Sequence, residues 1–141
     1  MRDGRIEVGT VVLEPSLNEG SLLAAAGASL KPLIHNGVYR SYLLPKTAVN
    51  GRDFRPSAYF KDGQLTSVHL TYADPHTEGG CAWENHSFER ERAIAKDDAR
   101  WLADELRGVG SLTDTYTFKW GRIWSGFDER SGFSSIVVSY N

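Results

Sequence analysis

The sequence predicts an α+β fold: a twisted, mainly antiparallel sheet of about five to seven strands, with one long helix at about residues 87–108 packed on one face and a short N-terminal helix. Three observations predict it. Several segments alternate apolar and polar residues, a glycine-bearing turn joins the clearest pair, and one segment repeats apolar residues at helical spacing. The 141 residues suffice for one core, so we expect a single domain over residues 1–141.

The N-terminal part supplies strands around a short helix. Residues 5–13 (RIEVGTVVL) alternate β-branched side chains and predict one strand. Ser16 precedes Glu19 by three residues, which fits a capping box, and Gly27 fits the end of a short helix. Residues 38–44 (VYRSYLL) predict the next strand.

Residues 57–72 form the clearest predicted hairpin. Asp62-Gly63 supplies the positive φ angles of a type I′ turn. Leu65 has the wrong parity for the core face of the second strand, so we expect a bulge or a twist near Thr66. The core face of that strand is formed by Val68, Leu70 and Tyr72.

The long helix begins with Ser87 as its N-cap and stops at Gly108. Its apolar stripe covers one face of the sheet and is formed by Ile94, Trp101, Leu102 and Leu106. Asp98 adjoins this stripe, and a buried carboxylate needs a partner. We expect Arg122, Lys119 or an indole N–H to serve, in a clamp between helix and sheet that we prefer over catalysis.

The C-terminal segment predicts strands that close the sheet. Apolar positions change parity after Trp120, which predicts a one-residue bulge at Gly121. Residues 128–132 (DERSG) predict a turn in which Asp128 bonds its own backbone. Residues 136–140 predict the final strand.

Composition narrows the function classes. The formal net charge of −2 offers no basic excess for phosphates, so we expect no nucleic-acid binding. No apolar run is long enough for a signal peptide or a membrane span, so we expect no membrane association. Cys81 is the one cysteine, which excludes an intramolecular disulfide and favours the cytoplasm.

The aromatic and basic residues suggest a protein-binding patch. Trp, Tyr and Arg dominate binding hot spots. We therefore expect an exposed surface patch formed by Tyr39, Arg122, Trp124, Asp128 and Arg130. We assign structural roles to Asp98, Trp101, Trp120 and Gly121.

A second constellation is His76, Cys81 and His86, which lie in a glycine-bearing segment at the spacing H-x4-C-x4-H. These residue types bind zinc, and a cysteine with a nearby histidine also suits nucleophilic hydrolysis. The spacing matches no common zinc signature, so we expect no cofactor and keep zinc as an alternative. A solvated loop is the competing interpretation.

Two segments also carry a resemblance. SFERERAIAKDDARWLADELRGVG followed by YTFKWGRIWSGFDERSGFSSIVVSY resembles a group of small bacterial α+β proteins with no established activity. Their pattern is an acidic-start helix ending in Trp-Leu, a Trp-Gly strand, an Asp-containing turn and a final Ile-Val-x-x-Tyr strand. A His-Asp pair often seen before the Trp-Leu is Asp97-Asp98 here, which weakens a catalytic role for that position.

Three hypotheses of function follow. The leading one is a non-enzymatic domain that binds another protein in the bacterial cytoplasm, immunity-like in that it neutralises a toxin. The first alternative is a small metal-assisted or cysteine hydrolase that uses His76, Cys81 and His86. The second is a structural homodimer formed by an exposed edge strand. The sequence leaves open whether the chain is a monomer or a homodimer.

Overall fold

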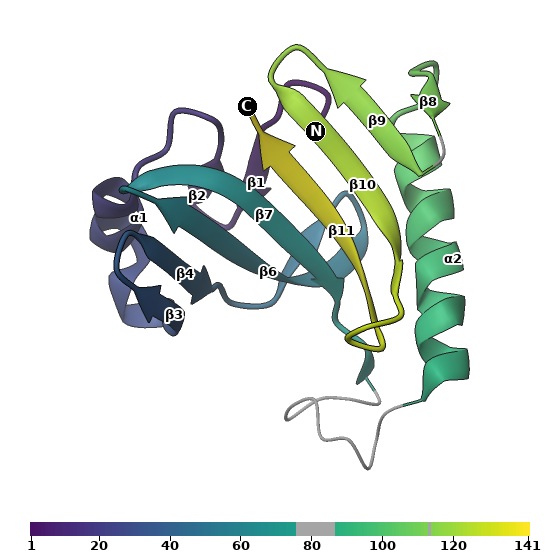
Figure 1. Cartoon of the computed structure of the whole chain (residues 1–141), viewed down its shortest axis with the longest axis horizontal. Helices are drawn as coiled ribbons and strands as arrows, with labels where there is room; N and C mark the ends of the chain where they lie inside the picture. Colours follow the sequence, from purple (N-terminus) through teal and green to yellow (C-terminus); the bar gives the residue numbers. More distant parts are fainter. Residues whose placement is uncertain (76–86, 113) are drawn as a thin grey trace.

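The computed structural model describes residues 1–75, 87–112 and 114–141. It confirms the predicted class: a mostly antiparallel sheet carries one main helix and a short helix on its N-terminal side (Figure 1). The helical elements are α1 (Glu19–Ala26), the 3-10 turn η1 (Gly27–Ser29) and α2 (Phe88–Glu105).

Within the described residues the main sheet has nine strands, more than the five to seven expected, because short pairing segments escape sequence patterns. Eight follow the order β3-β4-β6-β7-β11-β10-β9-β8, and β5 pairs with β6. The strands are β3 (Lys31–Asn36), β4 (Tyr39–Leu43), β5 (Thr47–Val49), β6 (Arg52–Lys61), β7 (Gln64–Tyr72), β8 (Ser111–Leu112), β9 (Thr115–Phe118), β10 (Gly121–Asp128) and β11 (Phe133–Tyr140).

One face of the sheet is covered and holds the core. The helix α2 packs on β10 and β11, while α1 and a small hairpin, β1 (Ile6–Val8) with β2 (Val11–Leu13), cover the part nearer β6. Apolar side chains from all these elements form one buried cluster, which includes Leu22, Phe54, Leu70, Leu102 and Ile136. The opposite face of the sheet is left without a covering layer of helices or strands from the described residues.

The central hairpin agrees with the sequence. Asp62 and Gly63 have φ angles of 52° and 77°, as a type I′ turn requires. The pairing passes from Tyr59↔Ser67 to Phe60↔Leu65, which leaves Thr66 as an extra residue, so of the two predicted alternatives the bulge is present. This shift is what brings Leu65 into the core with Val68 and Leu70.

The N-terminal prediction is wrong in two details. Residues 5–13 form the two strands β1 and β2, because the chain reverses at Gly9, which has a φ of 61°. The N-cap of α1 is Asn18, whose Oδ1 accepts from the Ser21 amide at 2.8 Å. Ser16 does not cap, since its hydroxyl donates to Glu14 instead.

The predicted bulge at Gly121 is also wrong. The chain turns at Lys119-Trp120, and Gly121 pairs with Phe118 in the antiparallel ladder of β9 and β10. The parity change in the sequence therefore marks a turn. Gly121 is needed for another reason, because a Cβ there would lie 1.9 Å from the Ser139 carbonyl oxygen.

The predicted long helix and the last turn are confirmed. Ser87 caps α2, with its hydroxyl accepting from the Arg90 amide at 3.2 Å. Residues between β10 and β11 form the turn, and Asp128 Oδ1 accepts from the Arg130 amide at 2.9 Å. Among the helices of the described ranges, none combines the length and apolar character that a membrane crossing requires.

Candidate functional site

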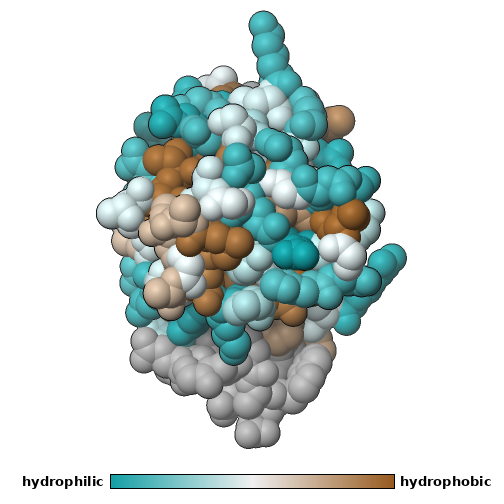
Figure 2. Space-filling model, turned by 90° about the vertical axis from the view of Figure 1, so that its left-hand side faces the viewer, coloured by the Kyte–Doolittle hydropathy of each residue, from teal (hydrophilic) through white to brown (hydrophobic). Residues whose placement is uncertain are grey.

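The most distinctive surface lies at one edge of the sheet, where β3 and β4 meet α1. Large apolar side chains there are between 41% and 54% exposed. Figure 2 faces this side of the molecule and shows hydrophobic atoms gathered on it. We call this set the edge surface; it consists of Leu23, Leu33, Ile34, Val38 and Tyr39.

Local sequence explains why this hairpin stands out from the core. Gly37 has a φ of 60° at the first turn position, which suits a tight two-residue hairpin loop. The strand β3 is the last strand at its end of the sheet, and all of its residues are exposed. Apolar residues that would be buried in a central strand therefore face solvent here.

The outer strand is irregular. The register of β3 shifts between Pro32 and Ile34, which leaves Leu33 as an extra residue. Proline has no N–H, and both features interrupt the row of backbone groups that an edge strand offers to another strand. The side chains, more than the backbone edge, are therefore the groups that this surface presents.

Basic residues surround the edge surface. Lys31 and Lys61 are exposed, and Lys61 Nζ lies 5.8 Å from the ring centre of Tyr39. Arg40 lies 3.9 Å from the carboxylate of Glu19. That carboxylate also accepts a hydrogen bond of 2.6 Å from the Tyr42 hydroxyl, which fixes it against the core side of the hairpin.

The predicted surface patch is divided between two regions. Arg122 and Trp124 lie on β10, with their side chains on the uncovered face. The row Ser41–Tyr59–Ser67–Ser139–Arg122 crosses four strand intervals, or about 19 Å, so Tyr39 belongs to the edge surface and not to this group. Asp128 and Arg130 are exposed at the turn that ends β10.

Trp124 is half-buried rather than fully exposed. A Cβ at Gly126 would lie 2.6 Å from the Trp124 ring, so the indole lies over that glycine. Arg122 two residues earlier is exposed. This part of the open face presents one flat aromatic group and one cation.

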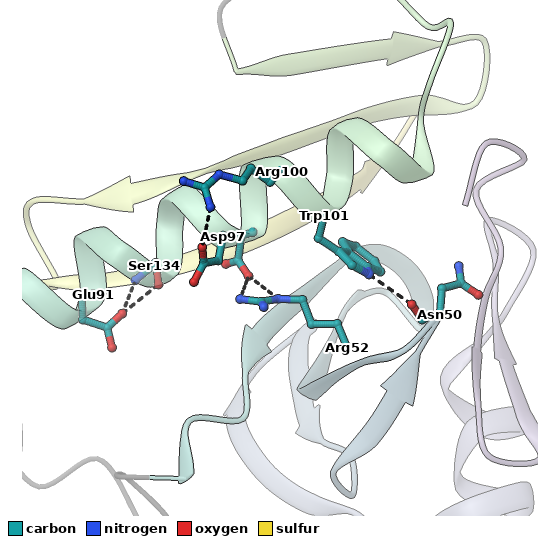
Figure 3. A network of polar contacts seen from close by, with 8 residues as sticks. Asn50, Arg52, Glu91, Asp97, Arg100, Trp101 and Ser134 are labelled. Carbon is teal, nitrogen blue, oxygen red and sulfur yellow. Dashed lines mark hydrogen bonds and ion pairs between the residues drawn. The ribbon is translucent and has the colours of Figure 1, made fainter.

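The predicted helix-to-sheet clamp is present, but its partner is Arg52 on β6. Asp98 is fully buried, and its Oδ1 accepts from Arg52 Nε at 3.0 Å and Nη2 at 2.8 Å. Figure 3 labels the Arg52 side chain that donates these bonds. The expected partners Arg122 and Lys119 were wrong, because Arg122 is on the opposite face of the sheet. The guanidinium of Arg52 also lies 4.1 Å from the ring centre of Tyr72.

Burial dominates the electrostatics of Asp98. Loss of water raises the pKa of its carboxyl to about 6, although Arg52 acts to lower it. Asp98 Oδ2 has no hydrogen-bond partner among the described residues. One oxygen of the carboxylate is therefore paired with Arg52, and the other is buried without a partner among the described residues. Burial of this second oxygen costs free energy when the carboxylate is charged.

Two further contacts hold α2 on the sheet. Glu91 accepts from the amide and hydroxyl of Ser134 at 2.9 and 2.8 Å (Figure 3). Trp101 packs edge-on against Phe54 and donates to the Asn50 carbonyl at 3.3 Å. The polar contacts between α2 and the rest of the fold are thus distributed along the helix, at Glu91, Asp98 and Trp101.

Trp120 has a structural role at the other end of the sheet. Its indole N–H donates to the Arg2 carbonyl at 2.7 Å, and its ring stacks on Phe118. Gly4 lies against this ring, since a Cβ there would be 2.8 Å from it. The N-terminal segment is held to the sheet by these contacts.

The described residues provide no geometric support for the catalytic and metal-binding alternatives. His76, Cys81 and His86 lie outside the described residues. Among the described residues no group of three or more His, Cys, Asp or Glu side chains is placed to hold a metal ion. A cavity of about 630 Å³ beside the N-terminal segment and β5 has neither histidine nor cysteine among its described lining residues.

Sequence reasoning missed most of the edge surface. The run Leu33-Ile34-His35-Asn36-Gly37-Val38-Tyr39 contains the signal, because Asn-Gly between apolar residues is typical of a hairpin. Only Tyr39 from this surface was predicted.

The comparisons with known proteins bear on the fold. No family model and no curated protein matches the chain. A chain of the solved complex of Rhs1-CT with its cognate immunity protein RhsI1 is similar in structure, with a TM-score of 0.56. The match covers 99% of this chain and 83% of that chain at 15% identity, so it shows a shared fold and no more.

Proposed function

We propose that this chain is a non-enzymatic protein-binding domain that is immunity-like, meaning that it binds one partner protein and neutralises it. The observation that carries the proposal is the edge surface, where five large apolar side chains are 41% to 54% exposed at one edge of the sheet. Exposed apolar patches of this kind are typical of interaction sites.

The likeness of fold supports the proposal. The similar chain comes from a complex between a protein and its cognate immunity protein, so either chain of that complex binds a protein. A protein partner needs no cofactor and no catalytic cleft. The bacterial cytoplasm remains the predicted setting.

The aromatic group on the open face is a second contact region in this proposal. Trp124 and Arg122 on β10 lie on the same face of the sheet as Tyr39, about 19 Å across it. A standard interface buries roughly 800 Å² on each partner, which is wide enough to include both regions. Asp128 and Arg130 at the neighbouring turn would then lie at the rim.

The first experiment is native mass spectrometry of the chain isolated gently from the cells that produce it. We expect a co-purifying polypeptide, whose purified form then binds with nanomolar affinity and whose activity or toxicity is suppressed by the chain. A mass equal to the bare chain, together with no protein retained on the immobilised chain, would contradict the proposal. An added zinc mass would instead favour the hydrolase alternative.

The second experiment locates the interface. Ile34→Ser with Tyr39→Ser removes apolar side chains from the edge surface, and we expect binding to weaken by about 30-fold or more, as at a hot spot. Leu112→Ser is the matched control, because Leu112 is 83% exposed on β8 at the far end of the sheet. Trp124→Ala tests the open face separately. Equal binding by all variants would contradict both contact regions.

A further inference from the structure

Charge is distributed unevenly along this chain. Residues 20–52 contain four Lys and Arg residues and no Asp or Glu, so all 18 acidic residues lie outside this stretch. The formal net charge of the whole chain is nevertheless −2. The stretch builds most of α1 and all of β3, β4 and β5. Of its cations, Lys31 on β3 and Arg40 on β4 lie at the edge of the sheet, whereas Arg52 is paired with Asp98.

The cations at the edge surface are available to a partner. Neither Lys31 nor Lys61 has an ion pair to a carboxylate of the described residues, and both are exposed. Arg40 is about half exposed and makes a long contact of 3.9 Å with Glu19. The Glu19 carboxylate is bonded to the Tyr42 hydroxyl. Asp62 is exposed next to Lys61, and its amide donates to the Val38 carbonyl, so Lys31, Arg40 and Lys61 outnumber the carboxylates Glu19 and Asp62 at this edge.

We infer that the edge surface docks an acidic region of a partner protein, in which apolar side chains cover Leu33, Ile34 and Tyr39 while carboxylates face Lys31 and Lys61. This inference rests on the proposed function and specifies the chemistry of its partner. Charge complementarity of this kind steers association and selects among partners. Apolar contact at the centre with charge at the rim is the usual anatomy of a protein interface.

A second copy of this chain is a poor occupant. A two-fold interface brings the same surface patch of both copies together, so the cations Lys31 and Lys61 of both copies would be gathered in one interface. Edge-to-edge strand pairing is also disfavoured, because Pro32 and the irregular register at Leu33 interrupt the outer backbone of β3. Both features favour a protein other than a second copy of this chain as the partner of the edge surface.

The aliphatic side chains of the edge surface also disfavour nucleic acid as its partner. Single-stranded nucleic acid is bound by stacking its bases on aromatic rings in a basic groove. Four of the five edge-surface side chains are aliphatic, and Tyr39 is the single aromatic among them. Anionic lipid would meet the same combination of apolar and basic groups, so vesicles enter the test as a competing outcome.

The test uses the full chain and four probes: a synthetic peptide alternating glutamate and leucine, the same peptide with lysine for glutamate, phosphatidylserine vesicles and a single-stranded oligonucleotide. We expect amide chemical-shift changes on adding the glutamate peptide, confined to residues 31–43 and 61. Affinity should fall at least tenfold between about 50 mM and about 500 mM NaCl because the contacts are screened. The lysine peptide should not bind.

Paired charge reversals identify the cations. Lys31→Glu with Lys61→Glu should weaken glutamate-peptide binding at least tenfold. Lys96→Glu with Lys119→Glu is the matched control, since it makes the same change in net charge at exposed positions on α2 and beside β9. That control should retain binding within about twofold, because charges beyond a Debye length are screened.

Several results would overturn the inference. They are equal binding of both peptides, equal loss in both double variants, tighter binding to vesicles or oligonucleotide than to the glutamate peptide, or dimerisation through this edge in sedimentation. If a natural partner binds with nanomolar affinity but is unaffected by Lys31→Glu with Lys61→Glu, the inference fails while the proposed function stands. If the peptide binds as expected and no natural partner exists, the proposed function fails and the surface chemistry stands.

Discussion

Replacement of Asp98 by Asn tests how the helix is held on the sheet. Asp98 is fully buried, bonded through one oxygen to Arg52, and its pKa is raised to about 6 by burial. A carboxyl with a pKa above its unfolded value of 3.8 stabilises the fold fully at low pH. That contribution is lost as the pH rises through the folded pKa, because the folded state binds the proton more tightly.

The magnitude follows from the shift. A change of about 2 pKa units corresponds to roughly 3 kcal/mol between full protonation and full ionisation. Between about pH 4 and about pH 7.5 the accessible part is roughly 2 to 3 kcal/mol, since the unfolded carboxyl is already partly ionised at pH 4. Asn cannot ionise in this range and removes the dependence.

The assay is urea unfolding of both proteins over that pH range. We expect the free energy of unfolding of Asp98→Asn, minus that of the wild type, to rise by roughly 2 to 3 kcal/mol from pH 4 to pH 7.5. Taking the difference cancels the titration of other groups. Asp97→Asn is the control, because Asp97 is exposed and makes a surface ion pair with Arg100; its difference should change by less than about 0.5 kcal/mol.

A flat difference for Asp98→Asn, or one that falls with pH, would refute this reasoning. It would mean that Arg52 stabilises the charged form more than burial opposes it. The folded pKa would then lie at or below the unfolded value.

Three other substitutions test backbone and cap positions, two through urea unfolding and one through tryptophan fluorescence. Gly121→Ala should destabilise by about 3 kcal/mol or more, because its Cβ would meet the Ser139 carbonyl at 1.9 Å; normal stability would contradict the placement of the two strands. Gly4→Ala should displace the Trp120 ring and change tryptophan fluorescence, with unchanged emission as the contrary result. Ser87→Ala should cost about 1 kcal/mol through loss of the α2 cap, while Ser87→Thr should restore most of it.

Patterns within one element predicted the fold best. The hairpin around Asp62-Gly63 and the helix capped by Ser87 were both predictable, because their signals lie within a few residues. The strand β3 was missed since Pro32 and the extra residue Leu33 break its alternation. At Gly121 the sequence showed a change of parity, and a tight turn and a bulge produce the same change.

The candidate site was less predictable for a physical reason. Apolar residues in a strand look the same in sequence whether the strand is central or at the edge, so the exposure of Ile34 required the strand order. The burial of Asp98 was anticipated from its place beside the apolar stripe. Its partner was not, because Arg52 is 46 residues away and nothing local marks the pairing.

The placement of β11 has a consequence for folding. This strand pairs with β7 on one side and β10 on the other, so it is the sole link between the hairpins of the first and second halves of the described sheet. Each hairpin forms from segments that are neighbours in sequence. Val138 on β11, in contrast, pairs with Val68 on β7, which is far from it in sequence. Contacts of such long range are slow to form. Joining β11 to β7 is therefore the step at which we expect folding to be slowest, and a destabilising change in β11 should slow the joining of the two halves.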